Sequence, residues 1–217
     1  MVKYFTPEEV AIHNCAEDCW VIIYDNVYDI TSLVQANPGE LIQPLLKNAG
    51  MSLSHWFNEK TKDVKTYIDP VKNIAMPYLP EGRYLHVPPE APTPWSTAQY
   101  ENPWWKDEQY IIGKLTAKKR LIKIVNMLTK TEDVIYVCDE ETIDDIRDRY
   151  LEYNAHSKSY TWKKIVGDAF VPLLMDTTLE GNGLADESEE FFKLQIDEDL
   201  YLTTLHIYYN DDLTVMW

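Results

Sequence analysis

The stretch 19–57 constrains the fold more than any other part of this 217-residue chain. Residues 20–24 (Trp-Val-Ile-Ile-Tyr) and 27–30 (Val-Tyr-Asp-Ile) are two β-prone runs, and only Asp25 and Asn26 separate them. Two such runs joined by two residues that tolerate positive φ form a β-hairpin. The sequence therefore predicts a hairpin whose turn is Asp25-Asn26.

Short helices are expected to follow the hairpin. Thr31 or Ser32 can cap the first helix, which ends at the Asn-Pro-Gly sequence of 37–39 because proline and glycine interrupt helical hydrogen bonding. Residues 41–48 have the apolar spacing of a second helix, and 52–57 begin a third.

A hairpin that leads into short helices around a Pro-Gly turn resembles the haem-binding core of cytochrome b5. The resemblance extends to Tyr4-Phe5-Thr6, Glu9-Val10, His13-Asn14, Ala49-Gly50, Phe57 and residues 111–115 (Ile-Ile-Gly-Lys-Leu). It implies a cytochrome b5-like domain over residues 1–117. Within this domain, Thr6, Pro7 and Glu9 also predict a capped helix start.

The residues that hold iron in that family are replaced. The resemblance puts the family's two histidine ligands at Asn37 and at or near Lys62, and neither residue offers the imidazole that binds iron strongly. His55 and Tyr67 are the other candidates, since tyrosine is the axial ligand in the membrane progesterone receptor branch. Both residues also have a purely structural interpretation: His55 as a packed histidine, and Tyr67 as a core tyrosine. Nothing in the sequence places His86.

A Pro/Trp-rich insertion is expected at 77–109. Seven of the twelve prolines lie between Pro77 and Pro103, and proline this dense excludes regular helix and sheet. The large apolar side chains of Trp95, Trp104 and Trp105 favour burial, so the segment is expected to wrap either its own domain or a neighbouring protein. Residues 63–68, just before it, are expected to be helical.

The pattern changes after residue 117. The expected elements of the second domain (118–217) are strands at 121–128, 134–137, 160–166 and 205–209, a helix beginning at 139–142 with Ile143, Ile146 and Tyr150 on its buried face, and a turn at 177–184. This order resembles the ubiquitin β-grasp fold, so the whole chain is expected to be α+β. Because it ends in Val-Met-Trp rather than Gly-Gly, the domain is expected to bind rather than to be conjugated. The acidic residues 186–190 and 197–199 suggest a solvated loop.

The net charge of −16 argues against nucleic-acid and acidic membrane surfaces and favours a basic partner. The chain has no apolar run of membrane-spanning length and no signal-like start, and its three cysteines suit a reducing cytosolic compartment. The basic residues Lys114, Lys118, Lys119, Arg120 and Lys123 are interpreted as a solvated strand edge rather than a docking patch. No catalytic constellation is recognisable, so no enzymatic activity is expected.

Taken over its whole length, the chain resembles the cytochrome b5 domain-containing protein 1 type. The matching segments are His-Trp-Phe at 55–57, residues 82–89 (Gly-Arg-Tyr-Leu-His-Val-Pro-Pro), Pro-Trp-Trp at 103–105, Ser-Tyr-Thr-Trp at 159–162 and Tyr-Asn-Asp-Asp-Leu at 209–213. That family is ciliary and associated with the radial spokes of the axoneme. The resemblance implies a non-enzymatic structural component of the cilium or flagellum, a cytoskeletal protein whose partners are other spoke proteins with basic or apolar docking surfaces.

Two alternatives stay open. A haem-binding redox sensor or electron carrier would use Tyr67 or His55 as an unusual ligand in a preserved pocket. A soluble adaptor would use the β-grasp surface to bind enzymes of the ubiquitin pathway. The main expectation is that no haem is bound.

Overall fold

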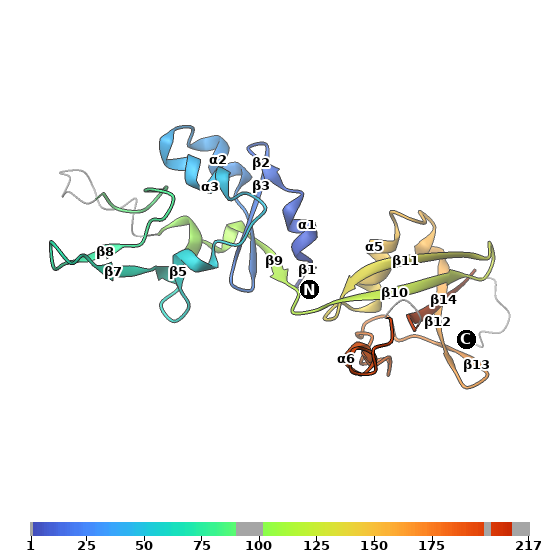
Figure 1. Cartoon of the computed structure of the whole chain (residues 1–217). Helices are drawn as coiled ribbons and strands as arrows, with labels where there is room; N and C mark the ends of the chain where they lie inside the picture. The colour runs from blue at the N-terminus through green and yellow to red at the C-terminus, as the bar shows by residue number, and fades with distance from the viewer. Residues whose placement is uncertain (1, 90–101, 198–200, 210–217) are drawn as a thin grey trace. The chain divides into compact units, whose positions relative to one another are not determined.

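The computed structural model describes residues 2–89, 102–197 and 201–209, and the chain divides into two compact units, Met1–Leu115 and Thr116–Trp217. Each unit holds a five-stranded sheet with short helices (Figure 1), which confirms the expected α+β class. Trp95, the prolines at 92 and 94, the acidic residues 198 and 199, and the Val-Met-Trp end lie outside the described residues.

The sheet of the first unit confirms the predicted hairpin and the predicted last strand. Its strand order is β1-β9-β4-β3-β2, with β1 parallel to β9 and the other pairs antiparallel. The strands are β1 (Tyr4–Phe5), β2 (Asn14–Cys15), β3 (Asp18–Ile23), β4 (Asn26–Asp29) and β9 (Ile111–Leu115).

The turn of the hairpin lies one residue earlier than the sequence predicted. Ile23 pairs with Asn26, so the two turn residues are Tyr24 and Asp25, and Tyr24 has the positive φ of 55°. Side-chain contacts hold Tyr24 in this conformation: its N–H donates to Ser54 Oγ at 2.7 Å, and its hydroxyl donates to the Phe57 carbonyl at 2.6 Å. A tyrosine is rarely found at positive φ, which is why the sequence favoured Asp25-Asn26.

The helices of the first unit are short, and one predicted cap is wrong. They are α1 (Pro7–Ala11), α2 (Thr31–Ala36), the 3₁₀ turn η1 (Glu40–Ile42) and α3 (Gln43–Lys47). Thr6 and Glu9 form the expected capping box of α1. Thr31 is instead the first residue of α2. Its hydroxyl accepts the N–H of Cys19 on β3 at 2.9 Å. That bond ties the helix to the sheet rather than capping it.

The predicted helix at 63–68 is wrong, and the predicted third helix is reduced to a single 3₁₀ turn. The elements found are η2 (Ser54–Trp56), β5 (Phe57–Asn58), β6 (Asp63–Val64), β7 (Thr66–Ile68) and β8 (Ala75–Pro77). They form two separate two-stranded hairpins, β5–β6 and β7–β8. Lys62, at a φ of 53°, lies in the turn between β5 and β6, and the pairing of β6 with β5 and of β7 with β8 replaces the expected helix.

The second unit has β-grasp topology. Its strand order is β11-β10-β14-β12-β13, with β10 parallel to β14 and all other pairs antiparallel. The strands are β10 (Lys119–Asn126), β11 (Thr131–Cys138), β12 (Tyr160–Val166), β13 (Ala169–Pro172) and β14 (Thr203–Tyr209). One helix, α5 (Ile143–Tyr150), buries Ile143, Ile146 and Tyr150 against this sheet, as predicted.

Two details of the second unit differ from expectation. Helix α5 begins after its cap Thr142, which forms a capping box with Asp145, so the acids at 139–141 precede the helix. Part of the acidic run forms a short helix, α6 (Ser188–Lys193), instead of an irregular loop. The remaining regular segments of the described chain are η3 (Trp104–Lys106), η4 (Glu108–Tyr110) and η5 (Ser157–Ser159).

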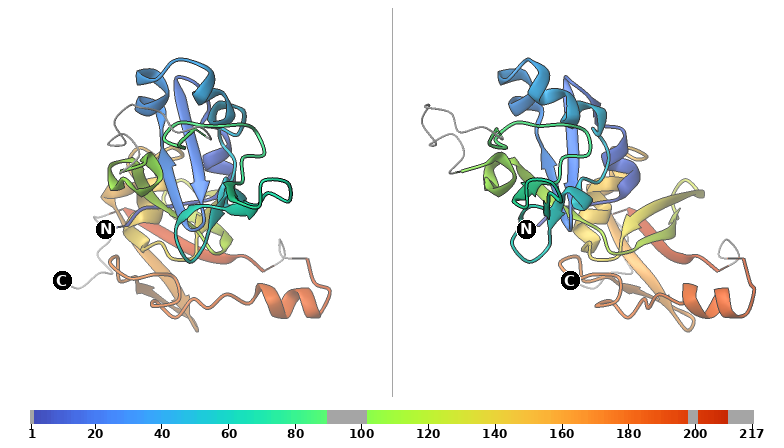
Figure 2. Two further views of the ribbon diagram at one scale, coloured as in Figure 1. Left: turned by 90° about the vertical axis from the view of Figure 1, so that its left-hand side faces the viewer. Right: turned by 60° about the vertical axis from the view of Figure 1, so that its left-hand side comes forward.

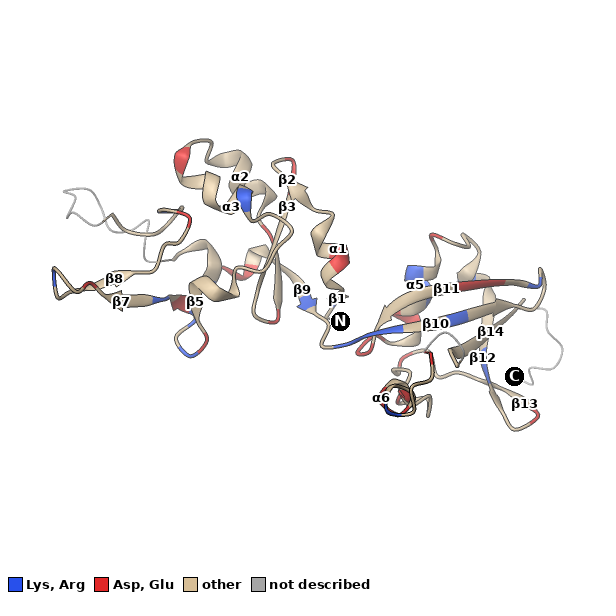
Figure 3. Cartoon of the chain, viewed as in Figure 1, with Lys and Arg blue, Asp and Glu red and all other residues tan. Residues whose placement is uncertain are grey.

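The basic residues at the start of the second unit are mostly paired. Arg120 is 5% exposed and contacts Asp139 at 3.2 Å together with the carbonyls of Leu184 and Ala185. Lys118 binds Asp186, and the pKa of Asp186 lies below its usual value because hydrogen bonds from Lys118 and Ser188 outweigh burial. Figure 3 shows basic positions of β10 beside acidic positions of β11, and Lys123 pairs with Glu132 across these strands.

Candidate functional site

The interior of the first unit is built around five aromatic side chains, Trp56, Phe57, Tyr84, Trp104 and Trp105, here called the aromatic cluster. None is more than 7% exposed. They come from η2 and β5, from the segment before residue 90, and from η3. The segment that includes residues 77–89, drawn in green in Figure 2, contributes Tyr84 and Val87 to the same buried core as β3 and β4. The described part of the Pro/Trp-rich insertion therefore wraps its own unit.

The rings of the aromatic cluster contact one another directly. Trp56 stacks on Tyr84 with centroids 4.9 Å apart, and Tyr84 meets Trp105 edge-on at 5.9 Å. Phe57 lies 5.6 Å from Trp105, and Trp104 lies 5.7 Å from Trp105. Edge-on and offset contacts at these separations are the favourable geometries of aromatic rings.

Four buried polar atoms of this cluster have no hydrogen-bond partner among the residues that the structure describes. Within the described residues, the indole N–H groups of Trp56, Trp104 and Trp105 and the hydroxyl of Tyr84 are buried without a hydrogen bond. Burial also raises the pKa of Tyr84 well above its ordinary value. Unpaired buried donors cost free energy, so packing of the ring faces must stabilise this arrangement.

His86 anchors the insertion to the cluster, a role that the sequence did not reveal. Its Nδ1 accepts the backbone N–H of Trp104 at 2.9 Å. His86 has a φ of 66°, and burial lowers its pKa below the usual histidine value. The neutral ring is the form that can accept this bond.

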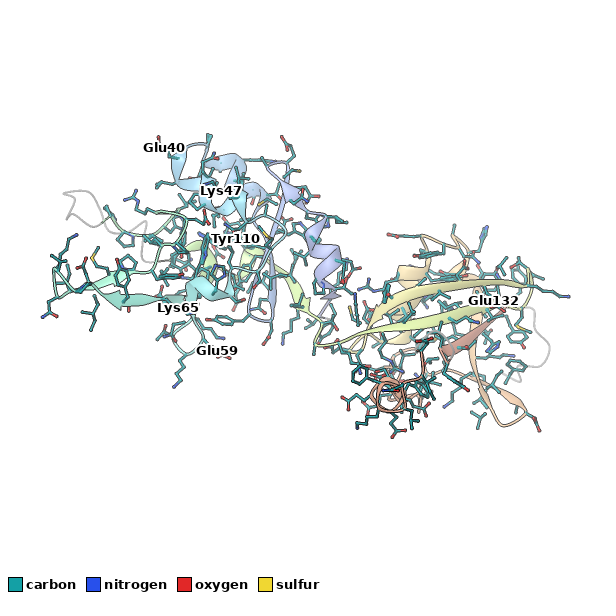
Figure 4. All side chains as sticks on the ribbon, in the orientation of Figure 1. Glu40, Lys47, Glu59, Lys65, Tyr110 and Glu132 are labelled. Atoms are coloured by element: carbon teal, nitrogen blue, oxygen red, sulfur yellow. The ribbon has the colours of Figure 1, made fainter. Side chains whose placement is uncertain are left out.

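Asn37 and Lys62, at or near which the sequence predicted the family's ligand positions, make other contacts. The Asn37 amide donates to the carbonyl of Leu33 at 2.9 Å and so closes the end of α2. The Lys62 ammonium lies 4.4 Å from the centre of the Tyr24 ring. In the adjoining turn, Glu40 points outward from the unit (Figure 4), and it is exposed.

His55 and Tyr67 also lie apart from the interior. His55 is exposed and meets Trp56 edge-on at 5.9 Å. Tyr67 is 48% exposed on β7. Among the described residues, no three histidine, cysteine or acidic side chains are grouped as a metal site requires. The structure therefore does not bring the four sequence candidates into one site.

Comparisons with known proteins identify the family. Residues 6–116 match the model of the "Cytochrome b5-like Heme/Steroid binding domain". The Xenopus laevis "Cytochrome b5 domain-containing protein 1" is 48% identical over 98% of this chain and 96% of its own length, and the human protein of that name is 45% identical over 98% and 92%. The chain belongs to the cytochrome b5 domain-containing protein 1 family. Drosophila melanogaster "Cytochrome b5" is 31% identical over 45% of this chain and 71% of its own.

For this member of the cytochrome b5 domain-containing protein 1 family, the residues present do not fit a haem. Ile23 of β3, Ile30 before α2, Leu33 of α2 and Leu45 of α3 share one core with the aromatic cluster. That core is closed by the chain's own side chains. Asn37 presents an amide donor already bonded to its helix, and the charged ammonium of Lys62 has no lone pair for iron.

No described helix of this family member could span a bilayer. The longest α-helix among the described residues, α5, has eight residues, whereas a span needs about 20.

Proposed function

We propose that the chain is a non-enzymatic structural component of the ciliary or flagellar axoneme, placed in the radial spokes, which supports motility by binding neighbouring spoke proteins. The family resemblance supports the location. The aromatic cluster supports the absence of cofactor chemistry, because side chains of the chain itself fill the interior of the cytochrome b5-like unit. On this proposal the unit serves as a rigid binding module.

The hairpin β7–β8 supplies the surface that supports this proposal best. Ile68, Val71 and Ile74 are 70%, 92% and 52% exposed on it. An isolated two-stranded hairpin is marginally stable in water, and neighbouring exposed apolar side chains mark interaction sites. The partner we propose offers an apolar surface, with basic groups around it that suit the net charge of −16.

The test is the location of the tagged chain in ciliated cells after detergent extraction. We expect it to sediment with axonemes and to lie at radial spokes by immunogold labelling. The variant Ile68→Ser/Val71→Ser should be released into the detergent supernatant. Ile12→Ser, which changes a residue 72% exposed on the loop after α1, is the matched control and should stay bound. Recovery of the wild-type chain only in soluble cytosol would refute the proposal.

A haem-linked redox role is the second candidate, and the match to the haem/steroid-binding model is the observation in its favour. Hemin titration of the purified chain tests it. A Soret shift that is lost in Tyr67→Phe or His55→Ala would support this role, and an unchanged hemin spectrum would exclude it.

A further inference from the structure

A separate hollow of about 350 Å³ opens on the first unit beside the hairpin turn. Tyr24, Tyr28, Phe57 and Trp105 supply its aromatic lining, and Lys62 and Lys114 are two of its cationic residues. Its volume is at the lower end of the range for small-molecule sites, which is roughly 300–1,000 Å³. A hollow of this size suits a ligand with only a few fused rings better than it suits a porphyrin.

Two strained residues meet at this hollow. Tyr24 and Lys62 have φ values of 55° and 53°, and the Lys62 ammonium lies 4.4 Å from the Tyr24 ring. Bonds from Tyr24 to Ser54 and to Phe57, and a backbone bond from Lys62 to Asn58, hold both in place. Strained residues held by their surroundings concentrate at binding sites. Here these bonds keep the Tyr24 ring and the Lys62 ammonium together at the hollow.

Two lysines of the hollow can face an anion. Lys62, Lys106 and Lys114 line it together with the acids Asp25 and Glu108, and the pair that Lys106 forms with Asp63 leaves two cations beside two anions. Lys106 is engaged with Asp63 at 2.6 Å. Within the described chain no ion pair involves Lys62 or Lys114. These two ammonium groups remain for a ligand.

We propose that this hollow binds a small planar aromatic monoanion. The aromatic lining offers ring faces for stacking, and Lys62 and Lys114 offer the countercharge. The family resemblance puts an iron ligand at or near Lys62, where this chain has a side chain suited to anions rather than to metal. The proposal concerns ligand binding alone and does not depend on where the protein resides in the cell.

The full-length chain can be titrated with two fluorescent probes that share an aromatic skeleton. Anilinonaphthalene sulfonate carries one negative charge, and phenylnaphthylamine is neutral. We expect the anionic probe to bind at least about tenfold more tightly at low salt, and the difference to shrink as sodium chloride is added. Equal affinities, or a preference that ignores salt, would overturn the proposal.

Variants locate the binding. Lys62→Met and Lys114→Met should each weaken the anionic probe about fivefold and leave the neutral probe unchanged. Lys60→Met changes an exposed lysine that does not line the hollow and is the matched control, with no expected effect. Ile111→Trp, which adds bulk to the lining, should abolish binding of both probes. Wild-type affinity for the anionic probe in Lys62→Met and Lys114→Met, with unchanged melting curves, would refute the site. Competition by hemin with a Soret shift would do so as well.

Discussion

The imidazole of His86 and the backbone of Trp104, 18 residues apart, are joined by a hydrogen bond of 2.9 Å in which the ring is the acceptor. Protonation of Nδ1 would remove the acceptor. Burial lowers the pKa of His86 in the folded state, so at mildly acid pH the unfolded chain takes up the proton first. The stabilising contribution is therefore full above the unfolded pKa, about 6.5, and is lost as the pH falls below it towards the folded pKa.

We expect the melting temperature of the first unit to fall as the pH drops below about 6.5 for this reason. His86→Asn is the informative variant, since asparagine tolerates the φ of 66° and its side-chain oxygen can accept the same bond without titrating. It should retain stability at neutral pH and lose part of the acid-side decrease. If the melting temperature of the variant fell at acid pH as much as that of the wild type, a group other than His86 would be responsible. His206, whose pKa burial also lowers, lies in the second unit.

The sequence predicted the elements whose signals are local. The strand at 160–166 was located to the residue from its β-prone run, and the strand at 111–115 from the family resemblance. The capping box at Thr6 was predicted likewise from side chains three residues apart, whereas the one at Thr142 was not. In the second unit, the order of elements was sufficient to predict the β-grasp topology.

The contacts of the candidate site could not be predicted, since tertiary packing decides them. No local pattern reveals that Tyr84 and Trp104 would enter the core of the first unit. Tyr24 at positive φ contradicts its own preference and is held by Ser54 and Phe57, which are distant in sequence. The helix expected at 63–68 failed for a related reason, because β6 and β7 pair with segments on either side of it.

Restoring the family's histidines should not restore haem binding. In Asn37→His/Lys62→His the two imidazoles would return, but the aromatic cluster and the helix residues would still fill the core between the elements that carry them. Hemin titration should therefore give the same spectrum for the double variant and the wild type. A sharp, bis-histidine Soret band would contradict this, and would mean that the cluster yields to a porphyrin.

Trp56 should be the most costly position of the cluster to truncate. It is fully buried and stacks on Tyr84 at 4.9 Å, so Trp56→Ala leaves a large cavity and should lower the free energy of unfolding by about 3–5 kcal/mol. Tyr67→Ala removes an aromatic side chain that is 48% exposed in the same unit, and should cost less than about 1 kcal/mol. Urea denaturation measures both. Similar losses in the two variants would show that the cluster is loosely packed.

In the second unit, the buried ion pair of Glu141 and Arg149 should matter far more than an exposed pair. The Arg149 Nε lies 2.6 Å and 2.8 Å from the two oxygens of Glu141, whose side chain is 5% exposed and which also accepts the Cys138 N–H at 2.9 Å. Glu141→Ala leaves both donors without this carboxylate, and we expect a loss of about 3 kcal/mol in unfolding free energy.

The matched control is Lys158→Ala, which breaks the pair with Asp148 at 3.2 Å on the same unit, where both side chains are more than half exposed. Solvent screens that pair, so the expected loss is about 0.5 kcal/mol or less. Glu141→Gln should lie between the two, because its amide oxygen still accepts the Cys138 N–H but no longer neutralises Arg149. If Glu141→Gln cost as little as Lys158→Ala, the hydrogen bond to Cys138 rather than the charge would be the stabilising element.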